Sequence, residues 1–202
     1  QHVNYKLRYR KEQAKFWASS YEEKRPELTT AQRKMLSHYD NATLYNDSIV
    51  AQIVKRFQKE DAVVIYVPDH GEECYEEDRG FICRNHSANI DWPLAHYEFE
   101  IPFWIYCSPK YIRNHRDIYR QIRKAKDKRF MTDALPHLLL YLAGIETPTY
   151  KEEYNILSPK YNEMRPRILK NSADYDQLRD EHLEKVEKEK SKKEKSKKGD
   201  KK

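Results

Sequence analysis

The sequence predicts an α/β fold in which helices flank a mixed sheet, followed by a charged C-terminal tail. Residues 32–59 carry apolar and aromatic side chains at helical spacing. Ala62–Val67 is a short, almost entirely apolar run rich in β-branched residues, which is typical of a strand. Lys188–Lys202 consists almost entirely of Lys, Glu, Ser, Gly and Asp and cannot bury enough apolar surface to fold. The 202 residues suit one domain or a large part of one.

Thr29 and Thr30 offer an N-cap, and the first helix is expected to begin at Gln32 and Arg33 and to end near Lys59. The strand Ala62–Val67 suits burial on both faces, as in a parallel sheet covered by helices. Residues 1–26 are expected to form a loop with a strand end at its start. After the strand, a polar loop runs to about Pro93.

A second strand is predicted over Phe99–Cys107, where Pro102 indicates a sheet edge or a bulge. Tyr111–Lys126 has the pattern of a charged amphipathic helix. A capped helix is predicted over Ala134–Ala143 and should stop at Gly144. Alternating helices and strands of this kind favour a layered α/β architecture.

The remaining residues divide the chain into a folded part and a tail. Thr147–Tyr175 shows little apolar periodicity and is expected to wrap the surface. We therefore predict a partial domain over residues 1–175. Residues 176–202 are predicted to be a Lys/Glu-rich tail, either disordered or a frayed helix.

The net charge of +6 suggests a nucleic-acid or membrane-surface partner, but its position argues against both. The lysines of Lys188–Lys202 supply more than this excess, so the rest of the chain is near neutral or slightly acidic. With only 4 glycines, the chain has no Gly-rich phosphate loop of the dinucleotide or P-loop kind. It also has no run of 18 or more apolar residues that could span a bilayer.

Neither a methionine nor a signal peptide stands at Gln1, so we expect a truncated chain whose missing part could hold an anchor or an export signal. Cys74 and Cys83 flank a short charged loop and could form a disulfide in an export compartment. Cys107 ends an apolar run and is expected to be a buried thiol.

Asp69 and His70 follow the first strand directly, where ligands gather in open α/β sheets. Carboxylate oxygen and imidazole nitrogen are zinc ligands, and a sharp turn at Gly71 would let both reach one ion. Glu72 could fix the tautomer of a ligating imidazole. A polar turn with His70 satisfied by a backbone carbonyl is the alternative interpretation of the pair.

Four segments occur in an order that resembles one known family. They are YDNATLYND at residues 39–47, VIYVPDHGE at 64–72 with Asn85–His86 after a polar loop, EIPFW at 100–104, and TDALPHLLLYLAGI at 132–145. Together they resemble the phosphoethanolamine transferases of the sulfatase and alkaline phosphatase superfamily over residues 2–145. The resemblance implies an alkaline-phosphatase-like sheet, of which this chain would be the C-terminal part.

The resemblance also implies roles for several residues. Asp69 and His70 match two metal ligands of the family. His86 matches a histidine that binds a second zinc or the substrate phosphate. His2 lies in a stretch that resembles a region whose histidine faces the substrate, although a glycine and a proline of that region are missing here. The resemblance implies a catalytic role for His86 and His2, which could stabilise charge on the phosphoryl oxygens or protonate the leaving group.

Three further groups have roles that the sequence leaves open. His96 could line the acceptor site or serve a structural purpose. Asp40 and Asn41 could brace the metal loop by hydrogen bonds, or they could simply be polar residues of a helix surface. Glu72 could accept a hydrogen bond from a ligating imidazole.

The function implied by the resemblance is zinc-dependent transfer of phosphoethanolamine from a phospholipid donor to lipid A or a lipopolysaccharide core sugar. The reaction would pass through a covalent threonine intermediate at the periplasmic face of the bacterial inner membrane. Thr29, Thr30 and Thr43 stand in the wrong context, so the nucleophile should lie in the missing N-terminal part and the isolated chain should be inactive. A sulfatase or phosphatase-type hydrolase and a non-catalytic zinc-binding fragment are the alternatives. No nucleic-acid partner is expected.

Overall fold

The computed structural model describes residues 4–76, 79–83 and 89–199, which fall into two compact units. The first unit comprises Gln1–Pro68, Glu72–Arg84 and Pro102–Asn114. The second comprises Asp69–Gly71, Asn85–Ile101 and His115–Lys202. Each unit is therefore assembled from segments that are far apart in the sequence.

The first unit contains a 28-residue helix and two short antiparallel sheets. Its elements are α1 Thr30–Phe57, α3 Pro109–Asn114, β1 Val63–Tyr66, β2 Glu73–Cys74, β3 Phe81–Cys83 and β4 Trp104–Cys107, with 3₁₀ turns at Tyr5–Leu7, Lys11–Gln13 and Ala18–Tyr21.

The second unit is mainly helical. Its elements are α2 Trp92–Leu94, a π-helix Ala95–Phe99, α4 Arg116–Ala125, α5 Leu135–Ala143, β5 Ile168–Leu169, β6 Ala173–Asp174 and α6 Tyr175–Gly199, with 3₁₀ turns at Thr132–Ala134 and Glu152–Tyr154.

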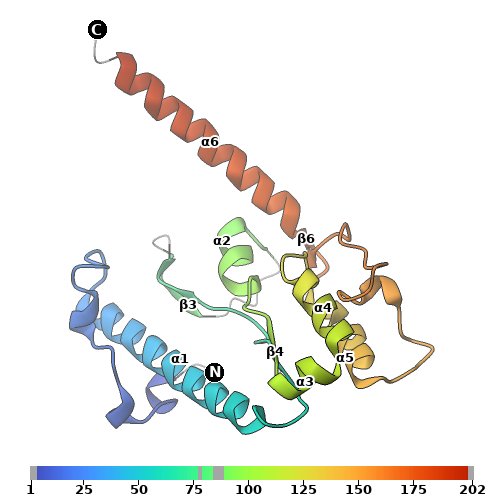
Figure 1. Ribbon diagram of the computed structural model, residues 1–202. Coiled ribbons are helices and arrows are strands. Elements are labelled where there is room, and N and C mark those ends of the chain that lie inside the picture. The colour runs from blue at the N-terminus through green and yellow to red at the C-terminus, as the bar shows by residue number, and fades with distance from the viewer. Residues whose placement is uncertain (1–3, 77–78, 84–88, 200–202) are drawn as a thin grey trace. The chain divides into compact units, whose positions relative to one another are not determined.

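Helix α1 confirms the first predicted helix. The Thr29 side chain accepts a hydrogen bond from the Gln32 amide, and the Gln32 side chain accepts one from the Thr29 amide. This capping box satisfies two donors that the first turn would otherwise leave unpaired. The 3₁₀ turns Tyr5–Leu7 and Ala18–Tyr21 lie against α1, as can be followed in Figure 1, and Tyr5 is buried. Among residues 4–26 there is no strand, so the strand end expected near the start is not found in that stretch.

Strand β1 differs in two ways from the prediction. It pairs antiparallel with β4, from Val63 opposite Cys107 to Tyr66 opposite Trp104, so the expected parallel neighbour is wrong for this pair. All four of its residues are also partly exposed. An apolar β-branched run favours a strand in either type of sheet, so the sequence could not decide the direction.

The second predicted strand is shorter than expected. β4 begins only at Trp104, because Ala95–Phe99 forms a π-helix and Pro102 has no amide hydrogen for a ladder. The prediction of a strand from Phe99 is therefore wrong over its first half. Cys107, at the end of β4, is buried as predicted, and this burial raises the pKa of its thiol.

One predicted helix is divided and another is confirmed. The Tyr111–Lys126 segment breaks at His115, whose φ of −126° and ψ of 50° are not helical, and this separates α3 from α4. Helix α5 ends at Gly144 as predicted, but its N-cap residue is Ala134, which makes no side-chain cap, so the predicted cap is wrong. The φ of Gly144 is 65°, a left-handed value that glycine adopts without strain.

Two segments predicted as loops contain more structure than expected. β2 and β3 form a short antiparallel hairpin within the polar stretch before Pro93. In the stretch expected to wrap the surface, residues Asn155–Ser158 are all buried, and Ile168–Leu169 pairs with Ala173–Asp174. The lack of apolar periodicity correctly predicted an irregular backbone. The prediction that this stretch wraps the surface is wrong for Asn155–Ser158, which are buried.

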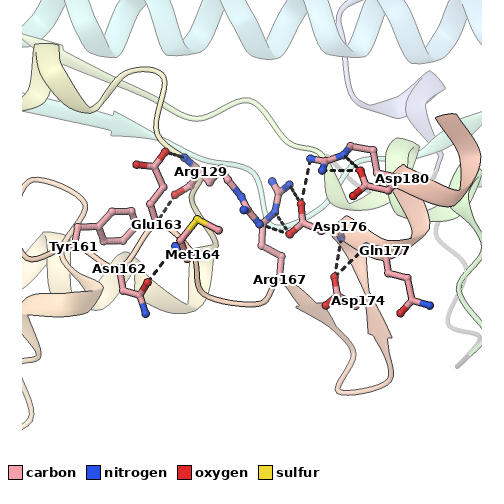
Figure 2. Close-up of polar contacts among 11 residues, drawn as sticks. Arg129, Tyr161, Asn162, Glu163, Met164, Arg167, Asp174, Asp176, Gln177 and Asp180 are labelled. Carbon is pink, nitrogen blue, oxygen red and sulfur yellow. Dashed lines mark hydrogen bonds and ion pairs between the residues drawn. The ribbon is translucent and has the colours of Figure 1, made fainter. Parts of the chain in front are cut away.

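Helix α6 begins at an ion cluster centred on Asp176. Figure 2 shows Arg129 and Arg167 converging on this carboxylate, and Arg179 lies 3.1 Å from it. Helix α6 covers most of the predicted charged tail, and the assignment of residues 176–202 as a separate tail stays a prediction. None of the helices in the described part of the chain is long and apolar enough to cross a membrane.

Candidate functional site

The loop after β1 brings the two predicted metal ligands together. The Nδ1 atom of His70 lies 2.7 Å from the carbonyl oxygen of Gly71. A carbonyl only accepts hydrogen bonds, so Nδ1 carries the hydrogen and, in the neutral ring, Nε2 keeps its lone pair. That Nε2 atom lies 3.7 Å from Oδ2 of Asp69. The loop therefore presents an imidazole lone pair beside a carboxylate oxygen.

Gly71 fixes this loop against the π-helix. Its amide donates a hydrogen bond of 2.8 Å to the carbonyl of Glu98. A Cβ atom on Gly71 would lie only 2.2 Å from the carbonyl oxygen of Tyr97. The sequence indicated the importance of this glycine, but for a sharp turn. The structural reason is the close approach of two backbones, since Gly71 does not have a positive φ.

The geometry of the Asp69–His70 pair fits a zinc ion. Zinc lies about 2.0–2.2 Å from nitrogen and oxygen ligands, so two ligands of a tetrahedral ion are about 3.4 Å apart. The observed separation of 3.7 Å is close to that value. The Asp69 side chain is 86% exposed and the His70 side chain 19%, so the carboxylate can move toward a shared ion without unpacking the imidazole.

The pair provides two ligands, and a zinc shell needs more. The described residues contain no group of three or more His, Cys, Asp and Glu side chains placed to hold a metal. Two residues with predicted roles at the site, His86 and His2, lie outside the described residues.

Asn41 and Asp40 make their visible contacts with the N-terminal segment. The buried Asn41 side chain accepts hydrogen bonds from the amides of Lys15 and Phe16 and donates one to the Phe16 carbonyl. Asp40 accepts a hydrogen bond from the Tyr21 hydroxyl. Burial first, and then this carboxylate, raise the pKa of Tyr21.

Glu72 is engaged in a similar way, because it accepts a hydrogen bond from the hydroxyl of Tyr5. Glu72, Asp40 and Asn41 belong to the first unit, whereas Asp69 and His70 belong to the second. Their bracing of a metal loop stays a prediction.

His96 lies in an aromatic and acidic cluster of the second unit. Its ring stacks on Trp92 with centroids 5.5 Å apart, and its Nδ1 lies 2.9 Å from Oε1 of Glu100. Burial disfavours ionisation of Glu100. Hydrogen bonds from Tyr175 and His96 outweigh that effect and lower the pKa of Glu100. The role of His96 at an acceptor site stays a prediction.

His182 was not among the predicted site residues, yet it stacks on Trp92 with centroids 5.4 Å apart. Trp92 thus contacts two imidazoles, those of His96 and His182. Because these histidines are 86 positions apart in a chain without repeats, no local sequence pattern could have indicated the cluster.

Comparison with known proteins gives a consistent picture. A family model described as Sulfatase matches residues 2–145. Phosphoethanolamine transferase EptC of Escherichia coli O18:K1:H7 is 32% identical over 185 residues, which are 88% of this chain. The Kdo(2)-lipid A phosphoethanolamine 7''-transferase of Escherichia coli K12 is 29% identical over 136 residues, or 63% of this chain. The expected resemblance to phosphoethanolamine transferases is therefore confirmed.

Solved structures support the same relationship. The C-terminal periplasmic domain of Escherichia coli EptC, in complex with Zn, aligns with 88% of this chain at 28% identity and a TM-score of 0.68. The alkaline-phosphatase-like fold is thus confirmed. The chain spans 30% of the length of the EptC relative from Escherichia coli O18:K1:H7 and 49% of the solved EptC domain.

Proposed function

Because the chain belongs to the sulfatase family, we propose that it is the C-terminal portion of a zinc-dependent phosphoethanolamine transferase domain. Residues 1–175 would contribute to the catalytic domain and residues 176–202 would form a charged extension. The observation that supports the metal site best is the Nε2 lone pair of His70, 3.7 Å from Oδ2 of Asp69. The EptC domain solved with Zn has 28% sequence identity and supports the same metal.

The protein's own residues would hold and orient the site. The Gly71 carbonyl keeps the hydrogen of His70 on Nδ1, so that Nε2 faces the ion, and Asp69 provides an anionic oxygen. Zinc, when bound, would lower the pKa of a hydroxyl nucleophile and stabilise negative charge on the phosphoryl group. His86 would complete the metal shell or contact the substrate phosphate, and His2 would contact the substrate.

The nucleophile of this proposal is a threonine outside the 202 residues. Thr29 caps α1, and Thr30 and Thr43 lie within that helix, which supports the choice. The threonine oxygen would form a bond to phosphorus while the bond from phosphorus to the glycerol oxygen of the phospholipid breaks. The glycerol oxygen takes up a proton, for which a histidine is a suitable acid. A hydroxyl oxygen of lipid A or a core sugar would then form a bond to phosphorus and give up its proton, while the bond from phosphorus to the threonine oxygen breaks and that oxygen takes a proton up.

The substrates and the site of action follow from the relatives. One relative is named for transfer to Kdo(2)-lipid A, and the solved EptC domain is described as periplasmic. We therefore propose a phospholipid donor, a lipopolysaccharide acceptor and action at the periplasmic face of the bacterial inner membrane.

Zinc titration by isothermal calorimetry tests the metal site directly. The wild-type chain should bind zinc, and His70→Ala and Asp69→Asn should each weaken binding by about 100-fold, because each removes one ligand. His96→Ala is the control, since this imidazole stacks on Trp92 and is not a proposed ligand. Equal zinc affinity in the wild type and the His70→Ala variant would refute the site.

The reaction itself requires a separate test in a longer protein that contains this chain. Mass spectrometry of lipid A from cells that express it should detect an added phosphoethanolamine group, which His70→Ala should abolish. Release of inorganic sulfate or phosphate from ester substrates without transfer would instead favour the hydrolase alternative.

A further inference from the structure

A groove of about 540 Å³ opens in the first unit and shares no residue with the Asp69–His70 pair. We call it the lysine groove. Its principal lining residues are Lys6, Tyr9, Lys11, Trp17, Lys34 and His38. Its volume lies within the range of small-molecule sites, which is about 300–1,000 Å³.

The charge of the lysine groove has one sign. Its lining includes three lysines and no acidic side chain. In the part of the chain that the structure describes, none of these three ammonium groups forms an ion pair with a carboxylate. Unpaired cations around a concave surface create a positive potential that attracts anions.

The walls of the lysine groove are held in place by buried contacts to helix α1. The Tyr9 hydroxyl lies 2.9 Å from Nδ1 of His38. Tyr5 is 1% exposed and packs edge-on against Tyr39 with centroids 5.2 Å apart. On the other side, the Asn41 side chain binds the backbone of Phe16, next to Trp17. The groove is therefore formed before any ligand arrives, which lowers the entropic cost of binding.

His38, which lines the lysine groove, offers a hydrogen-bond donor. Burial, then Lys34, then Lys6 lower the pKa of His38, which favours its neutral ring. When the Tyr9 hydroxyl donates to Nδ1, the hydrogen of this neutral ring is on Nε2.

Trp17 adds an apolar surface at the rim. Its side chain is 58% exposed, although a large aromatic ring gains free energy from burial. A ligand that combined an anionic group with an organic part would use both the lysines and this ring.

We propose that the lysine groove binds a small phosphate ester. The ammonium groups of Lys6, Lys11 and Lys34 contact the phosphate oxygens, and the rings of Tyr9 and Trp17 cover the organic part. Lysine binds phosphate as a point charge and needs no rigid geometry, which suits three flexible side chains from separate turns. This proposal does not depend on the proposed transferase function, because the two sites have no residue in common.

Calorimetric titration of the full chain with phenyl phosphate tests the proposal. Phenyl phosphate should bind more tightly than inorganic phosphate or phenol, because only the ester contacts both the lysines and the aromatic rings of the groove. The double variant Lys11→Gln, Lys34→Gln should weaken binding by about tenfold or more, as expected for the loss of charge-assisted contacts. Trp17→Ala should reduce the affinity for phenyl phosphate to that for inorganic phosphate.

Lys55→Gln is the matched control, because Lys55 is an exposed lysine of the same helix as Lys34 and does not line the groove. It should leave the affinity for phenyl phosphate unchanged. The substituted side chains are all exposed, so every variant should keep the melting temperature of the wild type. Equal losses in Lys55→Gln and the double variant would overturn the proposal, as would no binding of phenyl phosphate by the wild type.

Two further binding experiments distinguish a soluble phosphate ester from a lipid-borne one. Trehalose phosphate represents a soluble sugar phosphate, and sedimentation with phosphatidylglycerol vesicles represents a lipid-borne phosphate. If the wild type binds either ligand and the double variant does not, the result supports the lysine groove and identifies the kind of ester. If the double variant binds both ligands as the wild type does, the result counts against the proposal.

Discussion

At the residue scale, Gly71 allows the metal loop to pack, because its backbone lies where no side chain would fit. A Cβ atom there would lie 2.2 Å from the Tyr97 carbonyl oxygen, a backbone atom that cannot rotate away. We therefore predict that Gly71→Ala destabilises the fold by about 1–3 kcal/mol, as overpacking does. The displaced loop should also bind zinc at least about tenfold more weakly. Thermal unfolding and zinc calorimetry measure the two effects.

Gly144→Ala is the control that distinguishes a general loss of stability from a specific effect on zinc binding. Gly144 has a φ of 65° and open space around its missing Cβ, so alanine there should cost about 1–2 kcal/mol through backbone strain alone. Its zinc affinity should match that of the wild type. A Gly71→Ala variant with wild-type zinc affinity would show that the loop tolerates the shift.

The sequence pointed to Asp69 and His70 through their place after one strand and through the family resemblance, and their role as metal ligands stays a prediction. Their proximity is a local property of neighbouring residues. It could not predict which ring nitrogen is available, because that depends on the Gly71 carbonyl. Nor could it predict the contacts of Asn41, whose partners lie 25 and 26 residues away in an irregular segment.

At the element scale, Asp176 connects the start of α6 to the rest of the second unit. Three arginines surround its carboxylate, two from the preceding chain and Arg179 from the helix itself. The hydrogen bond from Arg167 is the main cause that lowers the pKa of Asp176, and the charges of Arg167, Arg129 and Arg179 add to it against the opposing effect of burial. The ionised carboxylate therefore stabilises the folded chain.

Asp176→Asn should lower the free energy of unfolding at neutral pH by about 1–3 kcal/mol, the usual range for hydrogen bonds to charged groups. A pKa depressed in the folded state means that this stabilisation is fully present above the ordinary value of 3.8. It is lost as the pH falls below 3.8 through the folded-state pKa. Urea unfolding over a pH series should therefore show the wild type and Asp176→Asn converging only in that acidic range.

Asp180→Asn is the control for this series. Asp180 also binds Arg179, but its side chain is 62% exposed, and exposed ion pairs contribute little to stability. The variant should unfold like the wild type at every pH. A constant difference between the wild type and Asp176→Asn down to the acidic limit would contradict the assigned role of the Asp176 charge.

Predictability at this scale depended on local signals. The start of α1 at its N-cap Thr29 and the end of α5 at Gly144 each depend on residues close together in the sequence. Both of these helix ends were therefore predicted. The break at His115 was not, because the amphipathic pattern continues through it. The π-helix Ala95–Phe99 was also missed, since its last residue was assigned to the strand predicted from Phe99 and its backbone contact is with the distant Gly71.

At the scale of the whole molecule, the two compact units were not predictable from composition. The chain passes between them at Asp69, Glu72, Asn85, Pro102 and His115, and these positions carry no common linker signal. The predicted division into residues 1–175 and 176–202 describes the charge pattern, and it stays a prediction. Family resemblance was the strongest whole-chain signal, because four ordered segments constrain the fold more than any single element.

Deleting Lys188–Lys202 should distinguish binding that depends on the net charge of the whole molecule from binding that depends on the lysine groove. The intact chain has a net charge of +6, and the lysines of this segment supply it, so the truncated chain should lose salt-sensitive retention on heparin. It should keep its affinity for phenyl phosphate, because Lys6, Lys11 and Lys34 remain. Replacing the tail lysines with glutamine at full length is the matched control and should behave like the truncation. If the truncated chain still bound heparin with undiminished salt dependence, a basic surface elsewhere in the folded part would have to account for it.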